Sequence, residues 1–211
     1  MDLDFLLYSI FTLFVIINPI GTVGIIRSLL DDYRKGERVQ IMHRAIIVAT
    51  SSLLIFTVFG NAIFSFLDID LYSFKIAGGI LLGVISFHMI FGQKQKAKHT
   101  SEEEAEWETM EDLAITPLAI PLMTGPGAIT TGILLYSSAV SGEQKIFVIL
   151  AVIIAFMLSY AIFRSSERIF TILGTTGTKV ITRMMGLILL AIAVQYITGG
   201  MVDFYYTVFA V

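Results

Sequence analysis

Two short strings of residues place a proline among glycine and helix-capping residues, and both strings lie inside long apolar segments. The first string is Asn18, Pro19, Ile20, Gly21 and Thr22, and the second is Thr124, Gly125, Pro126, Gly127 and Ala128. A proline inside a helix removes a backbone hydrogen bond and clashes with the preceding turn. The residue before the proline is driven out of the α region. Each segment is therefore predicted to hold two half-helices, the second starting at the proline.

The start of each second half-helix is a predicted anion site. Asparagine is a favoured N-cap and proline is favoured at the first helical position, so Asn18 is expected to cap a helix beginning at Pro19. Gly125 takes the same place, less well, before Pro126. The first amides of a helix are unpaired and carry partial positive charge, so two such ends near one point favour a carboxylate. Carbonyls freed before each break favour an ammonium group, and an amino acid carries both charges.

The amides nearest each restart are the predicted contacts of the substrate carboxylate. They belong to Ile20, Gly21, Gly127 and Ala128, with Asn18 and Thr124 assisting. Small residues let a ligand approach the backbone closely, which favours glycine, alanine and serine over leucine or phenylalanine. The alternative is a pair of kinked helices whose free backbone groups are satisfied by Ser, Thr or water.

The segments that position these strings are typical of a membrane protein. Of the 211 residues, 56% are hydrophobic and 15% are charged, and the mean hydropathy is +0.84. A soluble domain needs a more charged exterior, and roughly 20 apolar residues cross a bilayer as a helix. We predict a single all-α transmembrane domain, residues 1–211, with breaks near the middle of the first and fourth of six spans. The spans are Leu3–Leu30, His43–Phe66, Tyr72–Gly92, Leu113–Tyr136, Ile146–Phe163 and Val180–Val202.

Basic residues predict the orientation, because cytoplasmic loops carry an excess of Lys and Arg. They gather after the first, third and fifth spans, at Arg34, Lys35, Arg38, Arg44, Lys94, Lys96, Lys98, Arg164, Arg168, Lys179 and Arg183. The opposite side has Lys75 and Lys145. Both termini are therefore expected outside the cytoplasmic (inner) membrane. The polar segment Gln93–Asp112, which includes an acidic run, is expected to be a cytoplasmic loop.

The two halves of the chain match at a single offset of 107 residues. Pro19 falls on Pro126, and in the third span of each half Gly79 falls on Gly186 and Ile90 on Ile197. The expected repeats are residues 1–92 and 113–211, separated by the loop 93–112. Three spans per half is an odd number, so the second half enters the membrane from the opposite side, as in many secondary transporters. The alternative is a duplication retained for packing alone.

Several kinds of chemistry lack the residues they require. The chain has no cysteine, and no Asp or Glu lies at mid-membrane depth, so a substrate with a lone positive charge has no counter-ion. No metalloprotease, serine-nucleophile or P-loop motif is present, which argues against an enzyme, a metal site or a bound cofactor. Nothing favours a nucleic-acid partner. The coupling ion, H⁺ or Na⁺, stays open, and His88 is either a structural residue or a proton relay.

These strings resemble the MarC/SnatA family of membrane proteins over essentially the whole chain. The residues that carry the resemblance are Asn18-Pro19-Ile20-Gly21, Pro117-Leu118-Ala119-Ile120-Pro121 and Thr124-Gly125-Pro126-Gly127-Ala128-Ile129. The resemblance implies six spans, an inverted repeat and, from the SnatA branch, transport of glycine, alanine or similar substrates. The expected function is thus secondary transport of small neutral amino acids across the lipid bilayer. A passive pore or facilitator for small solutes on the same scaffold is the alternative.

Overall fold

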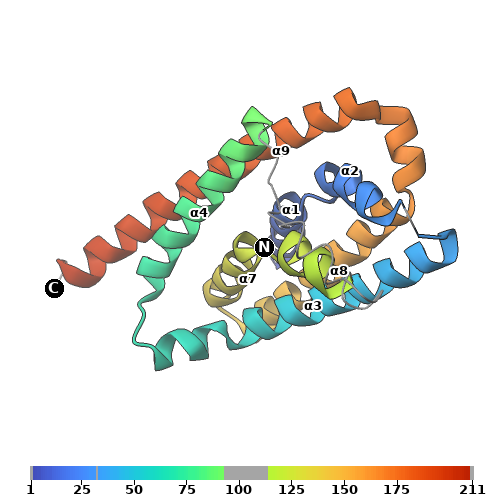
Figure 1. The fold of residues 1–211 in the computed structure, drawn as a ribbon. Coiled ribbons are helices and arrows are strands. Elements are labelled where there is room, and N and C mark those ends of the chain that lie inside the picture. The colour runs from blue at the N-terminus through green and yellow to red at the C-terminus, as the bar shows by residue number, and fades with distance from the viewer. Residues whose placement is uncertain (1, 32, 93–113, 210–211) are drawn as a thin grey trace.

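The computed structural model describes residues 2–31, 33–92 and 114–209, and the regular structure within these ranges is entirely helical. The predicted loop Gln93–Asp112 lies outside the described residues. Figure 1 shows α4 and α9 running side by side, with α1, α2 and α7 between this pair and α3. The elements are α1 (Asp2–Ile17), α2 (Pro19–Leu30), α3 (Lys35–Phe66), α4 (Leu71–Phe91), η1 (Ala114–Met123), α7 (Pro126–Ser138), α8 (Gly142–Arg164) and α9 (Ser166–Val208).

The described residues hold five helical segments that are long and apolar enough to cross a membrane. They are Leu3–Arg27, Lys35–Phe66, Leu71–Phe91, Gly142–Arg164 and Thr171–Val208. The predicted fourth span is present as two short helices, η1 with 10 residues and α7 with 13. Neither is long enough to span alone, so by length the described part offers five candidate spans where six were predicted.

The helices extend further into the charged regions than the sequence suggested. The second span was expected from His43, but α3 begins at Lys35. The expected loop between Phe163 and Val180 is helical apart from a turn at Ser165 and a sharp bend at Gly174. Lys and Arg are good helix formers and keep their charged ends in water, so a helix can continue past its apolar stretch. Gly174 has φ 61° and ψ −172°, a conformation that glycine alone adopts readily.

Helix boundaries recur at the offset found in the sequence. Pro19 begins α2 and Pro126 begins α7, while Lys35 begins α3 and Gly142 begins α8. The end of α3 before Leu67 corresponds to the bend at Gly174, because these two positions are also 107 residues apart. The stretch Gly142–Arg164 together with the first turns of α9 therefore matches the whole length of α3.

The α4–α9 pair makes one contact twice. A Cβ added at Gly79 would lie 2.7 Å from Ile197 and 2.8 Å from the carbonyl oxygen of Ala193. A Cβ added at Gly186 would lie 3.0 Å from Ile90. Gly79 and Ile90 on α4 thus face the residues on α9 that are their own sequence equivalents, and the two helices run antiparallel. Small residues at such contacts let helix backbones approach closely.

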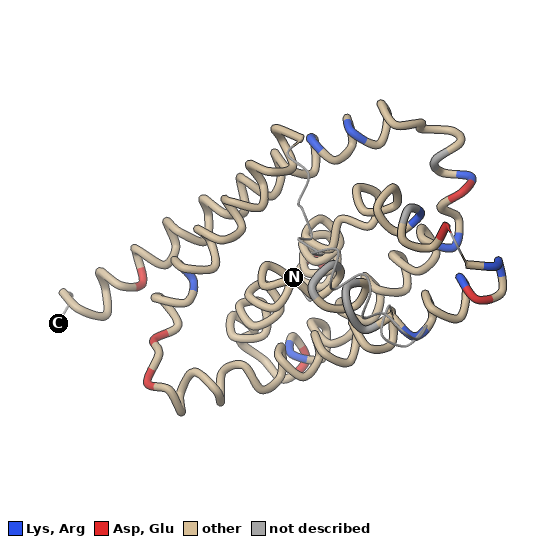
Figure 2. The backbone as a smooth tube through the Cα atoms, viewed as in Figure 1, with Lys and Arg blue, Asp and Glu red and all other residues tan. Residues whose placement is uncertain are grey.

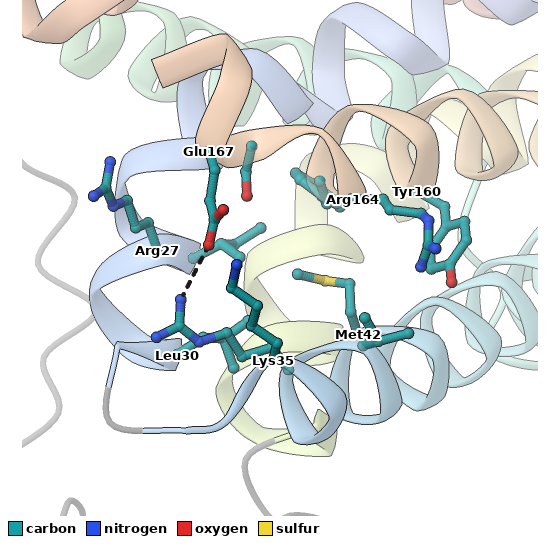
Figure 3. A pocket seen from close by; sticks show the side chains of 12 residues that line it. Arg27, Leu30, Lys35, Met42, Tyr160, Arg164 and Glu167 are labelled. Carbon is teal, nitrogen blue, oxygen red and sulfur yellow. Dashed lines mark ion pairs between the residues drawn. The ribbon is translucent and has the colours of Figure 1, made fainter. Parts of the chain in front are cut away.

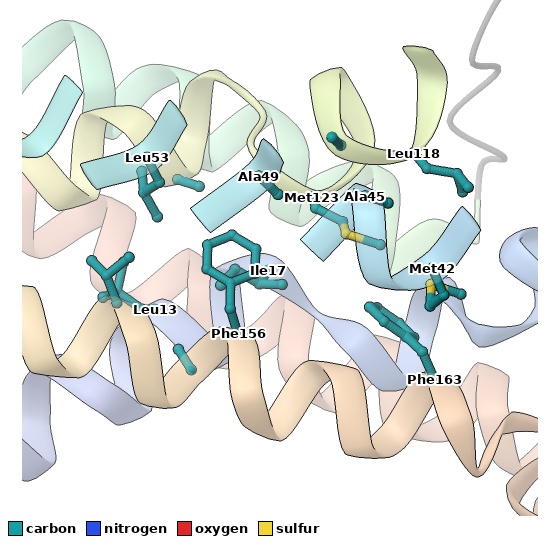
Figure 4. Packing of buried hydrophobic residues seen from close by; sticks show 14 of the residues in the cluster. Leu13, Ile17, Met42, Ala45, Ala49, Leu53, Leu118, Met123, Phe156 and Phe163 are labelled. Carbon is teal, nitrogen blue, oxygen red and sulfur yellow. The ribbon is translucent and has the colours of Figure 1, made fainter. Parts of the chain in front are cut away.

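A second buried region joins α1, α3 and α8. Figure 4 shows Phe156 of α8 pointing toward the face of α3 that carries Ala49 and Leu53. All three residues are at most 1% exposed, whereas Phe66 and Ile172 on the outer surface are 88% and 75% exposed. Large apolar side chains outside and small ones between helices are typical of a bundle solvated by lipid.

The close α4–α9 contact predicts opposite effects for one substitution at two positions of α4. Gly79→Ala should lower the free energy of unfolding by about 1–3 kcal/mol, because its methyl group strikes the α9 backbone. Gly83→Ala should be neutral or raise it by about 0.5–1 kcal/mol, because no atom lies within 4 Å of its added Cβ. Thermal unfolding of the purified protein in detergent checks this. Equal melting temperatures for the two variants would contradict the packing described.

Candidate functional site

The first break consists of the single residue Asn18, between α1 and α2. Asn18 has φ 48° and ψ 53°, the left-handed conformation that asparagine tolerates better than most residues. Its side-chain oxygen accepts a hydrogen bond from the amide of Gly21 at 3.3 Å, and Pro19 occupies the first helical position. The predicted cap and restart are confirmed. The break therefore depends on two features of Asn18, its backbone conformation and its amide side chain.

The second break follows a π-helix. The amide of Thr124 donates to the carbonyl of Ala119 at 2.9 Å, a bond that spans five residues instead of four. Gly125 is the N-cap and Pro126 the first residue of α7, as predicted. The buried hydroxyl of Thr124 donates to the carbonyl of Ala49 at 3.0 Å. This bond ties the break to α3, so the Thr124 side chain is already engaged within the protein.

Hydrogen bonds inside the breaks reduce the number of available amide donors. The Gly21 amide bonds to Asn18, and the Ala128 amide donates to the carbonyl of Gly125 at 2.9 Å. The Thr22 hydroxyl donates to the carbonyls that precede it. Within the described ranges, the amides of Ile20 and Gly127 have no hydrogen-bond acceptor. Ile20 and Gly127 are the second residues of their half-helices and lie 107 residues apart.

The two breaks lie side by side. A Cβ added at Gly127 would lie 3.7 Å from Ile16, two residues before the first break. It would also lie 2.9 Å from Leu82 and 3.1 Å from Ile85, both on α4. Gly127 is therefore enclosed by α1 and α4, and a larger residue at this position meets protein as well as any ligand. All ten predicted site residues lie within these two breaks and their first helical turns.

A basic pocket of about 290 Å³ lies where α2 and α8 end and α3 and α9 begin. Its charged lining residues are Arg27, Lys35, Arg38, Arg164 and Glu167. Figure 3 shows Arg38 joined to Glu167, an ion pair of 3.6 Å between α3 and α9. Glu167 was predicted to be merely solvated, and the structure instead makes it a link between two helix starts.

An acidic pocket of about 460 Å³ lies where α3 ends and α4 begins, beside the end of α7. Asp68 and Asp70 line it together with Asn61, which accepts a hydrogen bond from Ser137. Figure 2 shows basic residues gathered at the end with the first pocket and acidic residues at the α3–α4 turn. The two pockets are built from elements that correspond under the 107-residue offset, but they carry opposite charge. The residues of the breaks line neither of them.

Three polar residues near the breaks were not predicted as part of the site. They are Thr12 of α1, Thr131 of α7 and Tyr196 of α9, and each is at most 7% exposed. Their sequence signal is weak, because threonine and tyrosine are common in membrane helices. Only their position one turn from a break distinguishes Thr12 and Thr131.

The two features of Asn18 predict a graded series of variants. Asn18→Gly keeps a residue suited to the left-handed conformation and removes only the cap, which costs a few tenths of a kcal/mol. Asn18→Ala also forces a Cβ into that conformation, so it should lower the free energy of unfolding by about 2 kcal/mol in total. Chemical or thermal unfolding in detergent measures the difference. If alanine proves no worse than glycine, the left-handed break is incorrect.

Comparison with known proteins identifies the family. A model of the MarC family of integral membrane proteins matches residues 3–205. A UPF0056 membrane protein of Methanocaldococcus jannaschii is 40% identical over 95% of this chain and 97% of its own. A UPF0056 membrane protein of Bacillus subtilis is 34% identical over 95% of this chain and 96% of its own. One from Aquifex aeolicus is 34% identical over 90% and 89% of the two chains.

No solved structure matches this chain. The relatives' names state a membrane location and no substrate. The family model and the relatives each span nearly the whole chain and so include both breaks. The chain is a multi-pass integral membrane protein and belongs to the MarC family.

Proposed function

We propose that this protein is a secondary transporter of small neutral amino acids in the plasma membrane, and not an enzyme. The observation that carries the proposal is the pair of unpaired amides, Ile20 and Gly127, at the starts of two adjacent half-helices. Inside a membrane an unpaired amide is costly and needs an acceptor. A carboxylate supplies that acceptor, and the partial positive charge at both helix starts favours its negative charge.

The proposed architecture has six spans arranged as two inverted repeats, with η1 and α7 together forming the fourth span. The pattern of neighbouring helices supports this. α1 lies against α8 as η1 lies against α3, and α2 lies against α9 as α7 lies against α4. Each pair becomes the other when the halves are exchanged. α4 and α9 are antiparallel equivalents, so the axis that relates them is perpendicular to both and lies in the membrane plane.

The proposed orientation places the basic pocket in the cytoplasm and both termini outside. Arg27, Lys35, Arg38 and Arg164 gather at one end of the molecule. At the other end, the Lys75 ammonium is 2.9 Å from the Asp203 carboxylate, so its charge is compensated. This distribution agrees with the excess of Lys and Arg on the cytoplasmic side of membrane proteins.

The packing at the breaks favours a carrier over an open pore. Pro19, Thr124 and Gly127 are buried, and the two described pockets open at opposite ends of the bundle. A carrier holds its substrate in a site that is closed from both sides in part of its cycle, and a pore stays continuous. We assign the present arrangement to a closed state in which rearrangement of the halves opens the site to one side.

Transport is tested with purified protein in liposomes. Unlabelled alanine trapped inside should accelerate the uptake of labelled alanine, because a carrier exchanges substrate across its alternating site. Glycine and serine should compete, and leucine and phenylalanine should not. Uptake that internal alanine does not accelerate would indicate the passive pore, and binding of none of these amino acids would refute the proposal.

The site within this transporter is tested by a matched pair of glycine substitutions. Gly127→Val should abolish uptake, because its side chain fills the space beside the break. Gly83→Val is the control, since an added Cβ there has no atom within 4 Å. Gel filtration of both proteins checks that they fold. Normal uptake by well-folded Gly127→Val protein would place the substrate elsewhere.

The orientation is tested with single cysteines in a chain that has none of its own. Val140, which is 91% exposed between α7 and α8, should react as cysteine with an impermeant reagent added to intact cells. Gly36, at the start of α3, should react as cysteine only after the membrane is permeabilised. The reverse pattern would show the opposite orientation.

A further inference from the structure

Three buried hydroxyl groups beside the breaks have no partner within the described part of the chain. They belong to Thr12, Thr131 and Tyr196, which are 1%, 0% and 7% exposed. A buried hydroxyl without a hydrogen bond costs about 1–3 kcal/mol. Other hydroxyls in the same bundle avoid this cost. Ser9 and Ser159 each donate to the carbonyl one turn earlier, at 2.8 and 2.7 Å.

The three hydroxyls lie at one level of the bundle. Ile16 and Gly127 mark where α1 and α7 meet at the breaks. Thr12 is one helical turn before Ile16, and Thr131 is one turn after Gly127. Tyr196 of α9 lies beside Thr131 and also beside Tyr8, one further turn toward the start of α1. The α1 and α7 segments therefore extend from the breaks in the same direction, and the hydroxyls gather about one turn beyond the unpaired amides.

The distance between amides and hydroxyls matches an amino acid. One helical turn is about 5.4 Å, and the carboxylate and ammonium groups of an α-amino acid are separated by two bonds to a shared carbon. A carboxylate on the Gly127 amide thus directs its ammonium group toward Thr131. An ammonium group has three donors and no acceptor, and each hydroxyl oxygen can accept. Three hydroxyls therefore supply three acceptors.

We propose that Thr12, Thr131 and Tyr196 form the ammonium subsite for the substrate, an inference that rests on the proposed transport of amino acids. The sequence has no Asp or Glu in residues 5–30, 113–138 or 168–202. The subsite is therefore neutral, so it accepts an ammonium group only when a carboxylate in the same molecule balances the charge. This selects zwitterions against both simple amines and cationic drugs.

The fourth unpaired hydroxyl provides a matched control. Thr57 of α3 is also fully buried without a partner, but it lies against Gly132, where α3 and α7 touch. Thr57→Val therefore removes the same kind of group away from the proposed subsite. Thr131→Val and Thr12→Val are equal in shape to the native residues, and Tyr196→Phe removes only the hydroxyl.

The experiment measures alanine binding and ligand-free melting temperature of the purified variants in detergent. Thr131→Val and Tyr196→Phe should each bind alanine about tenfold more weakly, the size of one hydrogen bond to a charged group. Both should melt at the same or a higher temperature without ligand, because an unpaired buried hydroxyl has been removed. Propionate, which lacks the ammonium group, should bind the variants and the unaltered protein alike. Thr57→Val should bind alanine normally.

The outcomes separate this subsite from the proposed function. Unchanged alanine binding in all three hydroxyl variants, with binding lost in Gly127→Val, overturns the ammonium subsite and leaves the carboxylate site standing. Weaker binding together with a lower ligand-free melting temperature shows a structural role and also overturns it. If the unaltered protein binds no amino acid, the proposed function fails and the subsite fails with it.

Discussion

The absence of water inside a lipid bilayer is the constraint on which the rest of this structure depends. Every backbone amide and carbonyl freed within the membrane must find a partner in the protein. The prolines at 19 and 126 free such groups at two places, so the breaks have to be enclosed by neighbouring helices. Asn18 bonds to the amide of Gly21, and Thr124 reaches the carbonyl of Ala49 on another helix. The helices α1, α3 and α4 thus surround a polar core that contains no charged side chain.

Close packing around the breaks explains where glycine occurs. Gly79 and Gly186 allow α4 and α9 to approach, and Gly127 allows α7 to lie against α4 and α1. Removing a side chain from a helix has a cost in stability, and the close contacts offset it. The same device recurs in both halves at equivalent positions. A bundle held by backbone proximity has few deep apolar contacts to break, which suits two halves proposed to move against each other.

Charge distinguishes the ends of a molecule whose packing treats its halves alike. Corresponding elements build both pockets, yet one holds arginine and lysine and the other holds aspartate. Membership of the MarC family extends this arrangement of breaks and charged ends to relatives in archaea and bacteria only as far as their sequences agree. Their names leave the substrate open, so the chemistry of the breaks themselves is the basis for the proposed amino acid substrate.

The sequence by itself determined the helical class, both break positions and the offset between the halves. Each of these depends on local chemistry, namely apolar runs, the missing amide of proline and the capping preference of asparagine. Tertiary structure alone decided which amides stay free, because the Gly21 and Ala128 amides are taken by partners that periodicity does not reveal. It also decided that helix α3 begins at Lys35, that Glu167 pairs with Arg38, and that Thr12, Thr131 and Tyr196 meet. Such contacts join residues from different helices, and their geometry follows from how helices pack rather than from the order of residues along the chain.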